Sequence, residues 1–208
     1  MAFDGSFTTI SSPVRTELKI RNSRFIGTAM PVRSREEAME AVARIQKEFW
    51  DASHNCYAFR LAPDGLQYRF SDDGEPSGSA GKPILFVLQQ RSLLNVLVVI
   101  TRYFGGTKLG VGGLVRAYGD TAAAALDAAT VLEEFPTDRL RVYTTYEDIR
   151  VIRPLVERYA IRFEEEYLDA VHYVMVIRSD QVEPFAAELT DASQGRAGWV
   201  RLDHIEVP

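Results

Sequence analysis

The stretch from Ile100 to Tyr118 reads ITRYFGGTKLGVGGLVRAY and contains the strongest structural signal in the chain. It lies where a nearly all-apolar, β-branched segment, Leu93 to Tyr103, meets a helix predicted from Leu109 to about Leu132. The apolar segment is typical of a strand buried on both faces. The junction holds five glycines and no acidic residue before Asp120; its basic side chains are Arg102, Lys108 and Arg116. Such a loop predicts a site for a phosphate group or a nucleic-acid backbone.

The composition is that of an ordinary globular protein. The chain has 208 residues, of which 46% are hydrophobic and 25% charged, so its length suits one large or two small domains. No basic N-terminal segment is followed by an apolar run, and no window approaches the roughly 18 apolar residues of a membrane span. We therefore expect a cytoplasmic location without membrane contact. Cys56 is the single cysteine, which excludes an intrachain disulfide.

Charge is divided unevenly along the chain. Residues 1–135 hold 15 basic and 15 acidic side chains, whereas residues 136–208 hold 9 and 14. A new series of strand and helix patterns begins after Phe135-Pro136-Thr137-Asp138. This predicts two domains, 1–135 and 136–208. Because the net charge is −5, nucleic acid would need a local basic site on the first domain.

The first domain shows a mixture of strand and helix patterns. Ser34 and Glu37 form a capping box that starts a helix. A turn at 62–65 has hairpin chemistry, and the Gly- and Pro-rich segment 72–83 predicts an exposed loop before a short apolar helix at 84–88. Strands are predicted at Val14 to Ile20, Arg24 to Pro31, His54 to Leu61, Gln67 to Ser71 and Leu93 to Tyr103.

The second domain reads as βαββαβ, which is the ferredoxin-like order. Its predicted helices are marked by apolar spacing from Ile149 and from Val182. Pro154 lies within the first of them, so it must kink the helix or occupy its first turn. The predicted strands are Leu140 to Thr145, 161–167, 171–177 and Trp199 to Val207.

Four motifs together resemble the IMPACT/YigZ family. They are SRFI at Ser23 to Ile26, HNCYA at His54 to Ala58, RFSDDGEPSG at Arg69 to Gly78, and VITRYFGGTKLG at Val99 to Gly110. The motifs occur in the family's order across most of the first 135 residues, and the remainder is similar to the C-terminal domain of bacterial members.

The resemblance implies an α+β protein of two domains. It implies an N-terminal fold like the second domain of ribosomal protein S five, and a ferredoxin-like C-terminal domain similar to the last domain of elongation factor G. The corresponding pair in elongation factor G works on the ribosome, and eukaryotic family members act in translational control by competing for a regulator of a stress-responsive kinase. Such analogy does not establish a site, which must be argued from its residues.

The glycine-rich stretch supplies most candidate binding residues. Arg102 and Lys108 would contact phosphate directly, and Arg116 could reach the same anion or be solvated. Tyr103 and Phe104 follow Arg102, and aromatic rings beside cations suit stacking on unpaired bases. The spacing matches neither the nucleotide-binding phosphate loop nor the dinucleotide fingerprint, and a tight turn whose glycines serve packing is the alternative. The candidate set for ligand or nucleic acid is Arg102, Tyr103, Phe104, Gly105, Gly106, Lys108, Gly110, Arg116 and His54.

Two further clusters carry weaker signals. Asp72, Asp73 and Glu75 offer oxygen ligands for magnesium, but loop and helix-cap chemistry is the favoured explanation for them. His54 and Cys56 share one face of a predicted strand, where a thiol is usually buried and inert. His172 and His204 lie on predicted strands of the second domain without a visible partner and are interpreted as structural.

Three functions compete at this point. The favoured one is a translation-associated regulatory protein, not an enzyme, that binds RNA, the ribosome or a phosphate-containing ligand without a cofactor; its acidic second domain would meet a protein partner. The alternatives are a magnesium-dependent enzyme acting on a phosphorylated small molecule and a protein-interaction adaptor.

Overall fold

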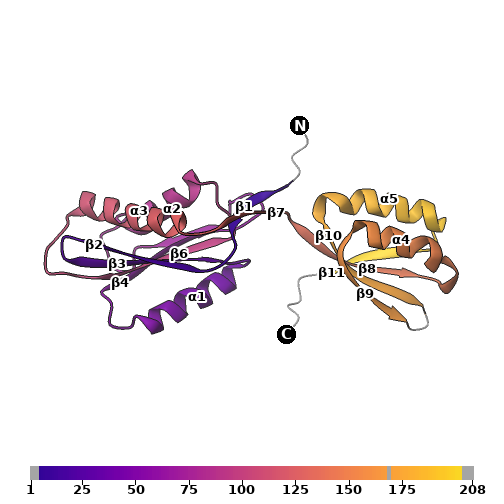
Figure 1. The fold of residues 1–208 in the computed structure, drawn as a ribbon, viewed down its shortest axis with the longest axis horizontal. Coiled ribbons are helices and arrows are strands. Elements are labelled where there is room, and N and C mark those ends of the chain that lie inside the picture. Colours follow the sequence, from indigo (N-terminus) through magenta and orange to yellow (C-terminus); the bar gives the residue numbers. More distant parts are fainter. Residues whose placement is uncertain (1–4, 168–169, 203–208) are drawn as a thin grey trace. The chain divides into compact units, whose positions relative to one another are not determined.

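The computed structural model describes residues 5–167 and 170–202 and contains two compact units (Figure 1). One unit is Phe7–Glu134, and the other runs from Phe135 and also includes Gly5 and Ser6. No helix among these residues is long and apolar enough to cross a membrane.

The first unit is built on a five-stranded antiparallel sheet with the order β2-β3-β6-β4-β5. The predicted strands all form, each within three residues of its expected ends. Their bounds are β2 Val14–Ile20, β3 Ser23–Pro31, β4 His54–Arg60, β5 Tyr68–Ser71 and β6 Val96–Tyr103.

Helices cover both faces of this sheet. Helix α1 (Arg35–Glu48) lies on one face, and α2 (Gly81–Gln90) and α3 (Val111–Asp127) lie together on the other (Figure 1). Alternate residues of the central strand β6 therefore enter two cores: Leu97 and Val99 pack in the α1 cluster, and Val98 and Ile100 in the α2 and α3 cluster. This two-sided burial is why β6 reads as a continuous apolar run.

Helix α1 begins at the expected cap. The N–H of Glu37 donates to Ser34 Oγ at 3.1 Å, and Glu37 Oε2 accepts the N–H of Arg33 at 2.6 Å. In a standard capping box the Glu37 carboxylate would accept the N–H of the cap residue, Ser34. Here it accepts the N–H of the preceding residue, and this bond still satisfies a free backbone donor at the start of the helix.

The predicted C-terminal end of α3 was wrong. The helix ends at Asp127, and Val131–Glu134 form strand β7, which pairs antiparallel with an unpredicted strand, β1 (Phe7–Ile10). The alanine-rich sequence favours a helix locally, but pairing with a strand about 120 residues away decides the outcome at 131–134.

The second unit has the predicted βαββαβ order, with antiparallel strands arranged β11-β8-β10-β9. Short 3₁₀ turns, η1 (Tyr146–Asp148) and η2 (Ser179–Gln181), precede its two helices. Pro154 lies inside the first helix, beyond its first turn. The bounds are β8 Thr137–Thr144, α4 Ile149–Tyr159, β9 Ala160–Tyr167, β10 Val171–Arg178, α5 Val182–Ser193 and β11 Gly198–Leu202.

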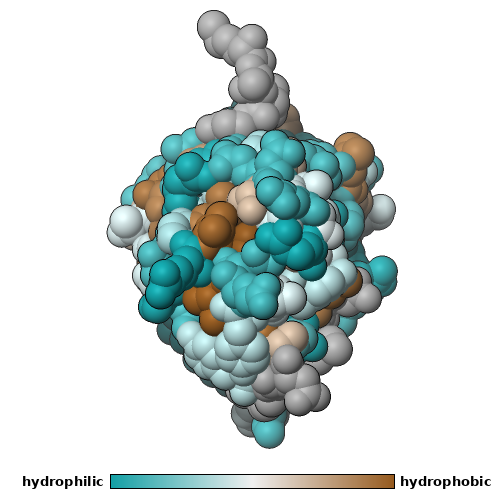
Figure 2. Space-filling model, turned by 90° about the vertical axis from the view of Figure 1, so that its right-hand side faces the viewer, coloured by the Kyte–Doolittle hydropathy of each residue, from teal (hydrophilic) through white to brown (hydrophobic). Residues whose placement is uncertain are grey.

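Both helices of this unit pack on one face of its sheet, so the opposite face has no helix of its own unit over it (Figure 1). On the side of the molecule seen in Figure 2, hydrophobic areas are small and separated by hydrophilic residues. The predicted last strand extends to Val207, but residues 203–208, which include His204, lie outside the described part of the chain.

Candidate functional site

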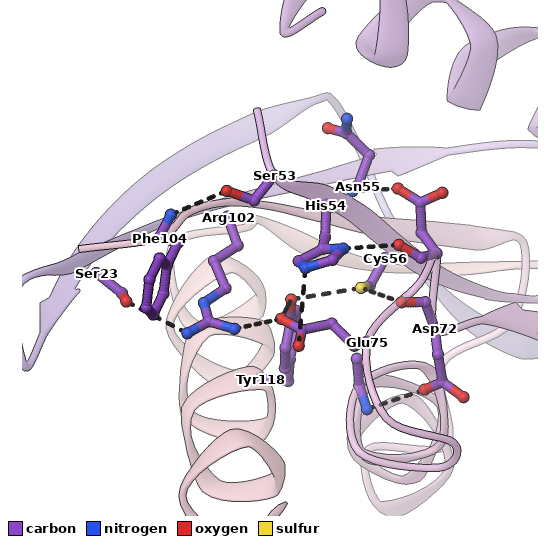
Figure 3. A network of polar contacts seen from close by, with 12 residues as sticks. Ser23, Ser53, His54, Asn55, Cys56, Asp72, Glu75, Arg102, Phe104 and Tyr118 are labelled. Atoms are coloured by element: carbon purple, nitrogen blue, oxygen red, sulfur yellow. Dashed lines mark hydrogen bonds and ion pairs between the residues drawn. The ribbon is translucent and has the colours of Figure 1, made fainter. Parts of the chain in front are cut away.

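The family motifs of the first unit converge on one buried ion pair, between Glu75 and Arg102 (Figure 3). Arg102 Nη1 donates to Glu75 Oε1 at 2.6 Å, and the hydroxyl of Tyr118 donates to the same oxygen at 2.7 Å. The side chains of Arg102 and Glu75 are only 6% and 4% exposed. Burial raises the pKa of Tyr118 far above its usual range, so its phenol stays protonated as a donor. The pair joins the loop before α2 to β6 and α3.

Strand β4 contributes His54 and Cys56 to the same network. His54 Nε2 lies 3.9 Å from Glu75 Oε2, and its Nδ1 lies 2.8 Å from the carbonyl oxygen of Asp73. The thiol of Cys56 donates to the carbonyl of Asp72 at 3.0 Å and lies 3.4 Å from the hydroxyl of Tyr118. Burial raises the pKa of Cys56 strongly, so the thiol stays protonated, as expected for an inert structural cysteine.

The acidic loop is held by protein donors. Asp72 Oδ1 accepts the N–H groups of Ala80 and Gly81, and its Oδ2 accepts that of Gly78, so this carboxylate caps the start of α2. Burial by itself would raise the pKa of Asp72, but these three N–H groups together lower it below its usual value. Asp73 Oδ2 accepts the N–H of Asn55 at 2.6 Å.

These contacts bear on the weak metal candidates Asp72, Asp73 and Glu75, because each carboxylate points to a different set of protein donors. Within residues 5–167 and 170–202, no group of three or more His, Cys, Asp or Glu side chains is arranged to hold a metal ion.

Three glycines of the Gly-rich loop have conformational or packing roles. A Cβ on Gly105 would lie 2.0 Å from the carbonyl oxygen of Asn22, and the N–H of Gly105 donates to Ser23 Oγ at 3.2 Å. Gly106 and Gly110 have φ of +83° and +73°, which other residues adopt at a cost. Their side-chain positions face open space. Close packing therefore explains the glycine at 105, and a positive φ explains the glycines at 106 and 110.

The loop opens into a basic pocket at the N-terminus of α3. No side chain caps this helix, and its first turn has no acidic residue. The pocket has a volume of about 360 Å³. Its lining combines the two exposed arginines Arg21 and Arg116 with Gly112 and Gly113 of the first helical turn, and is completed by Ile20, Leu109, Ala117 and Asp120.

The predicted binding residues divide between the network and the surface. Arg102 is bonded inside the protein and His54 is held against the acidic loop, so neither side chain is offered to this pocket. Tyr103 donates to Asp51 at 2.8 Å. Phe104 is 49% exposed, with the guanidinium of Arg102 5.5 Å from its ring centroid.

Lys108 is exposed on the loop that leads to α3, and Arg116 lines the pocket. Sequence reasoning missed Arg21, which lies in the β2–β3 turn, and Tyr118, whose hydroxyl reaches Glu75 from α3. A turn residue such as Arg21 carries no periodic signal that could place it beside a helix about 90 positions later.

Comparison with known proteins agrees with this architecture. Residues 21–126 match the family model described as the Impact N-terminal domain, and residues 144–196 match a domain of unknown function, DUF1949. The IMPACT family member YvyE of Bacillus subtilis is 34% identical over 92% of this chain and 89% of its own length. The crystal structure of a hypothetical protein superposes with a TM-score of 0.72 at 32% identity, covering 96% of this chain and 98% of the other.

A eukaryotic relative shares part of the chain. Protein IMPACT of Oryctolagus cuniculus is 33% identical over 94 residues, which are 43% of this chain and 29% of the rabbit protein. The family model and the bacterial relative together show that this chain belongs to the IMPACT family.

Proposed function

We propose that this protein is a translation-associated regulator that binds RNA, free or within the ribosome, by holding backbone phosphate in the basic pocket at the start of α3. Membership of the IMPACT family supports the regulatory part, because the resemblance links eukaryotic members to translational control. The pocket carries the binding part: Arg21 and Arg116 line it together with the uncapped first turn of α3.

The pocket suits an anion for two separate reasons. The first turn of any α-helix has N–H groups without intrahelical partners and a partial positive charge, and here no side chain of the protein caps them. Two guanidinium groups add full charges with planar donor geometry suited to phosphate. Asp120 also lines the pocket, about 13 Å along the helix from its first residue but only one turn after Arg116, so its charge offsets part of the positive charge.

Lys108 and Phe104 extend the proposed contact. Lys108 is exposed on the loop before α3, where its ammonium can reach a neighbouring phosphate. Phe104 exposes half of its surface at the end of β6, and an exposed aromatic ring beside a cation suits stacking on an unpaired base. Both roles are part of the proposal.

Binding of a fluorescein-labelled single-stranded oligoribonucleotide, followed by anisotropy over a range of salt concentrations, tests the site. The variant Lys108→Ala/Arg116→Ala should bind at least about tenfold more weakly, and the slope of log K against log salt should fall by about 1.4 because two phosphate contacts are lost. The matched control is Arg44→Ala/Lys47→Ala, an equal charge change on α1, on the other face of the sheet. Equal effects of the two variants would remove the proposed site.

One observation favours the adaptor alternative. A groove of about 320 Å³ between α2 and α3 is mainly apolar, and Phe86 and Val115 on its walls are 57% and 40% exposed. Affinity capture with and without nuclease separates the two functions, since a partner that binds the groove directly needs no RNA bridge. The carboxylates of Asp72, Asp73 and Glu75 all accept hydrogen bonds from protein groups, so nothing in their arrangement favours a magnesium-dependent enzyme.

A further inference from the structure

The second unit has a sheet face that its own helices leave open. Leu140 and Val142 of β8 point into the core under α4 and α5, so Arg139, Arg141 and Tyr143 point to the opposite face. The strand register brings further side chains to the same face: His172, Val174 and Val176 from β10, Arg162 and Glu164 from β9, and Gly198, Val200 and Leu202 from β11.

Basic charge gathers on this open face although the unit as a whole is acidic. Residues 136–208 contain 9 arginines and 14 acidic residues. Five of these arginines form ion pairs with carboxylates, whereas Arg139, Arg141 and Arg162 on this face, and Arg150 on α4, form none with any other described residue. The paired ones are Arg153, Arg158, Arg178, Arg196 and Arg201.

Three of the four unpaired arginines, Arg139, Arg141 and Arg162, lie close together on this face. Arg139 and Arg162 both stand opposite Val176, on either side of β10, so their backbones are about 10 Å apart across the sheet. Arg141 follows Arg139 two residues along β8, about 7 Å away. The acidic residues of this face, Glu164 and Glu166, are confined to the edge strand β9. The positive surface therefore runs along β8, between β11 and β10.

An aromatic ring lies flat beside these arginines. Gly198 stands opposite Tyr143, and a Cβ on Gly198 would come within 2.4–2.5 Å of the hydroxyl and ring carbons of Tyr143. The ring therefore lies across the glycine, and Tyr143 is 42% exposed. Val200, which is 46% exposed, and His172 flank it on the neighbouring strands.

From this arrangement we propose that the open sheet face of the second unit binds single-stranded RNA, as a second contact in addition to the pocket at α3. Arg139, Arg141 and Arg162 hold backbone phosphates, and a base stacks on the ring of Tyr143. Open four-stranded sheets that combine exposed aromatics with basic side chains are a general way to hold unpaired bases, since every base has a stacking face. Double-stranded RNA presents no unstacked base to such a ring, so single strands are preferred.

The test uses the full chain and a labelled oligouridylate. Arg139→Ala/Arg141→Ala should weaken binding at least about tenfold and lower the salt slope by about 1.4, because two phosphate contacts disappear. The matched control is Arg150→Ala/Arg153→Ala on α4, which removes the same charge from the helix-covered face and should change the affinity less than about twofold.

Stacking has a separate signature. Tyr143→Ala should weaken binding by about 5- to 100-fold without changing the salt slope, and Tyr143→Phe should restore most of the affinity. Gly198→Ala should have an effect in the same direction as Tyr143→Ala, because its methyl group displaces the ring. Unchanged melting temperatures would establish that these substitutions leave the fold intact.

The results separate this inference from the proposed pocket. If Lys108→Ala/Arg116→Ala abolishes binding while Arg139→Ala/Arg141→Ala and its control bind equally well, the sheet inference is overturned and the pocket stands. The reverse pattern supports the sheet and removes the pocket. A salt slope that changes with Tyr143→Ala, or failure of Tyr143→Phe to restore affinity, contradicts the stacking role.

Discussion

Replacing Glu75 by glutamine should destabilise the first unit by about 3–5 kcal/mol. The substitution keeps the shape of the side chain but removes the negative charge that faces Arg102, whose side chain is 6% exposed. Breaking a buried pair in this way leaves one charge without compensation, and losses of this size are typical. The same change also weakens the bond from Tyr118, because a charged acceptor is lost.

The magnitude can be measured by urea unfolding followed by far-UV circular dichroism, with scanning calorimetry as a second measurement. At about 3–5 °C per kcal/mol for a unit of this size, the first unit's transition should fall by roughly 10–25 °C. Arg102→Met should also be destabilising, and the double variant should lose less than the two single losses combined, since it removes both charges.

An exposed ion pair provides the control. Glu48 and Arg15 lie 2.6 Å apart, but their side chains are 48% and 43% exposed. Glu48→Gln should therefore change the free energy of unfolding by at most about 1 kcal/mol. If Glu75→Gln and Glu48→Gln have equal effects, the Glu75–Arg102 pair does not hold the family motifs together, and the reasoning is refuted.

The remaining predictions concern the same unit. Cys56 should resist alkylation by iodoacetamide at pH 8 in the folded protein and react on unfolding, because it is buried and its pKa is raised; rapid labelling of the folded chain would contradict this. Gly105→Ala should cost more stability than Gly106→Ala, because a Cβ on Gly105 would lie 2.0 Å from the backbone of Asn22. A Cβ on Gly106 faces open space, so that substitution adds only the strain of a positive φ, about 1 kcal/mol. The reverse order of the urea midpoints would be incompatible with the loop described. Asp72→Asn should destabilise at pH 7, and the difference from the parent should shrink as pH falls below about 4. The reason is that the lowered folded-state pKa of Asp72 contributes its full stability above the unfolded value of about 3.9 and loses it as pH falls from there through the folded-state pKa; a difference independent of pH would exclude this contribution. Gly112→Ala should raise stability by up to about 1 kcal/mol while weakening RNA binding, because the methyl group favours the helix but enters the pocket; unchanged binding would count against the pocket.

The strands of the five-stranded sheet and the second unit could be predicted because their signals are local. Strand β6 is apolar at almost every position because it is covered on both faces, and the βαββαβ order follows from alternation and helical spacing within about 70 residues. The end of α3 could not be predicted, because the strand that follows it, β7, forms by pairing with β1, which lies more than 100 residues earlier in the sequence.

The site was predicted less completely because its contacts are long-range. Arg102 reads as a free cation beside a glycine-rich loop, but Glu75, which lies 27 residues earlier, neutralises it in the interior. The acidic loop and Arg102 thus belong to one buried network rather than to a surface phosphate site. Arg21 reaches the pocket through the β2–β3 turn, and the binding roles of Lys108 and Arg116 stay predictions.

The most direct measurement of the central claim is an NMR titration of the ¹⁵N-labelled chain with a short single-stranded oligoribonucleotide. If phosphate binds at the start of α3, the amide signals of Gly112 and Gly113 should shift in proportion to occupancy, and the shifts should disappear in Lys108→Ala/Arg116→Ala. Binding that leaves both glycine amides unchanged would contradict the proposed pocket.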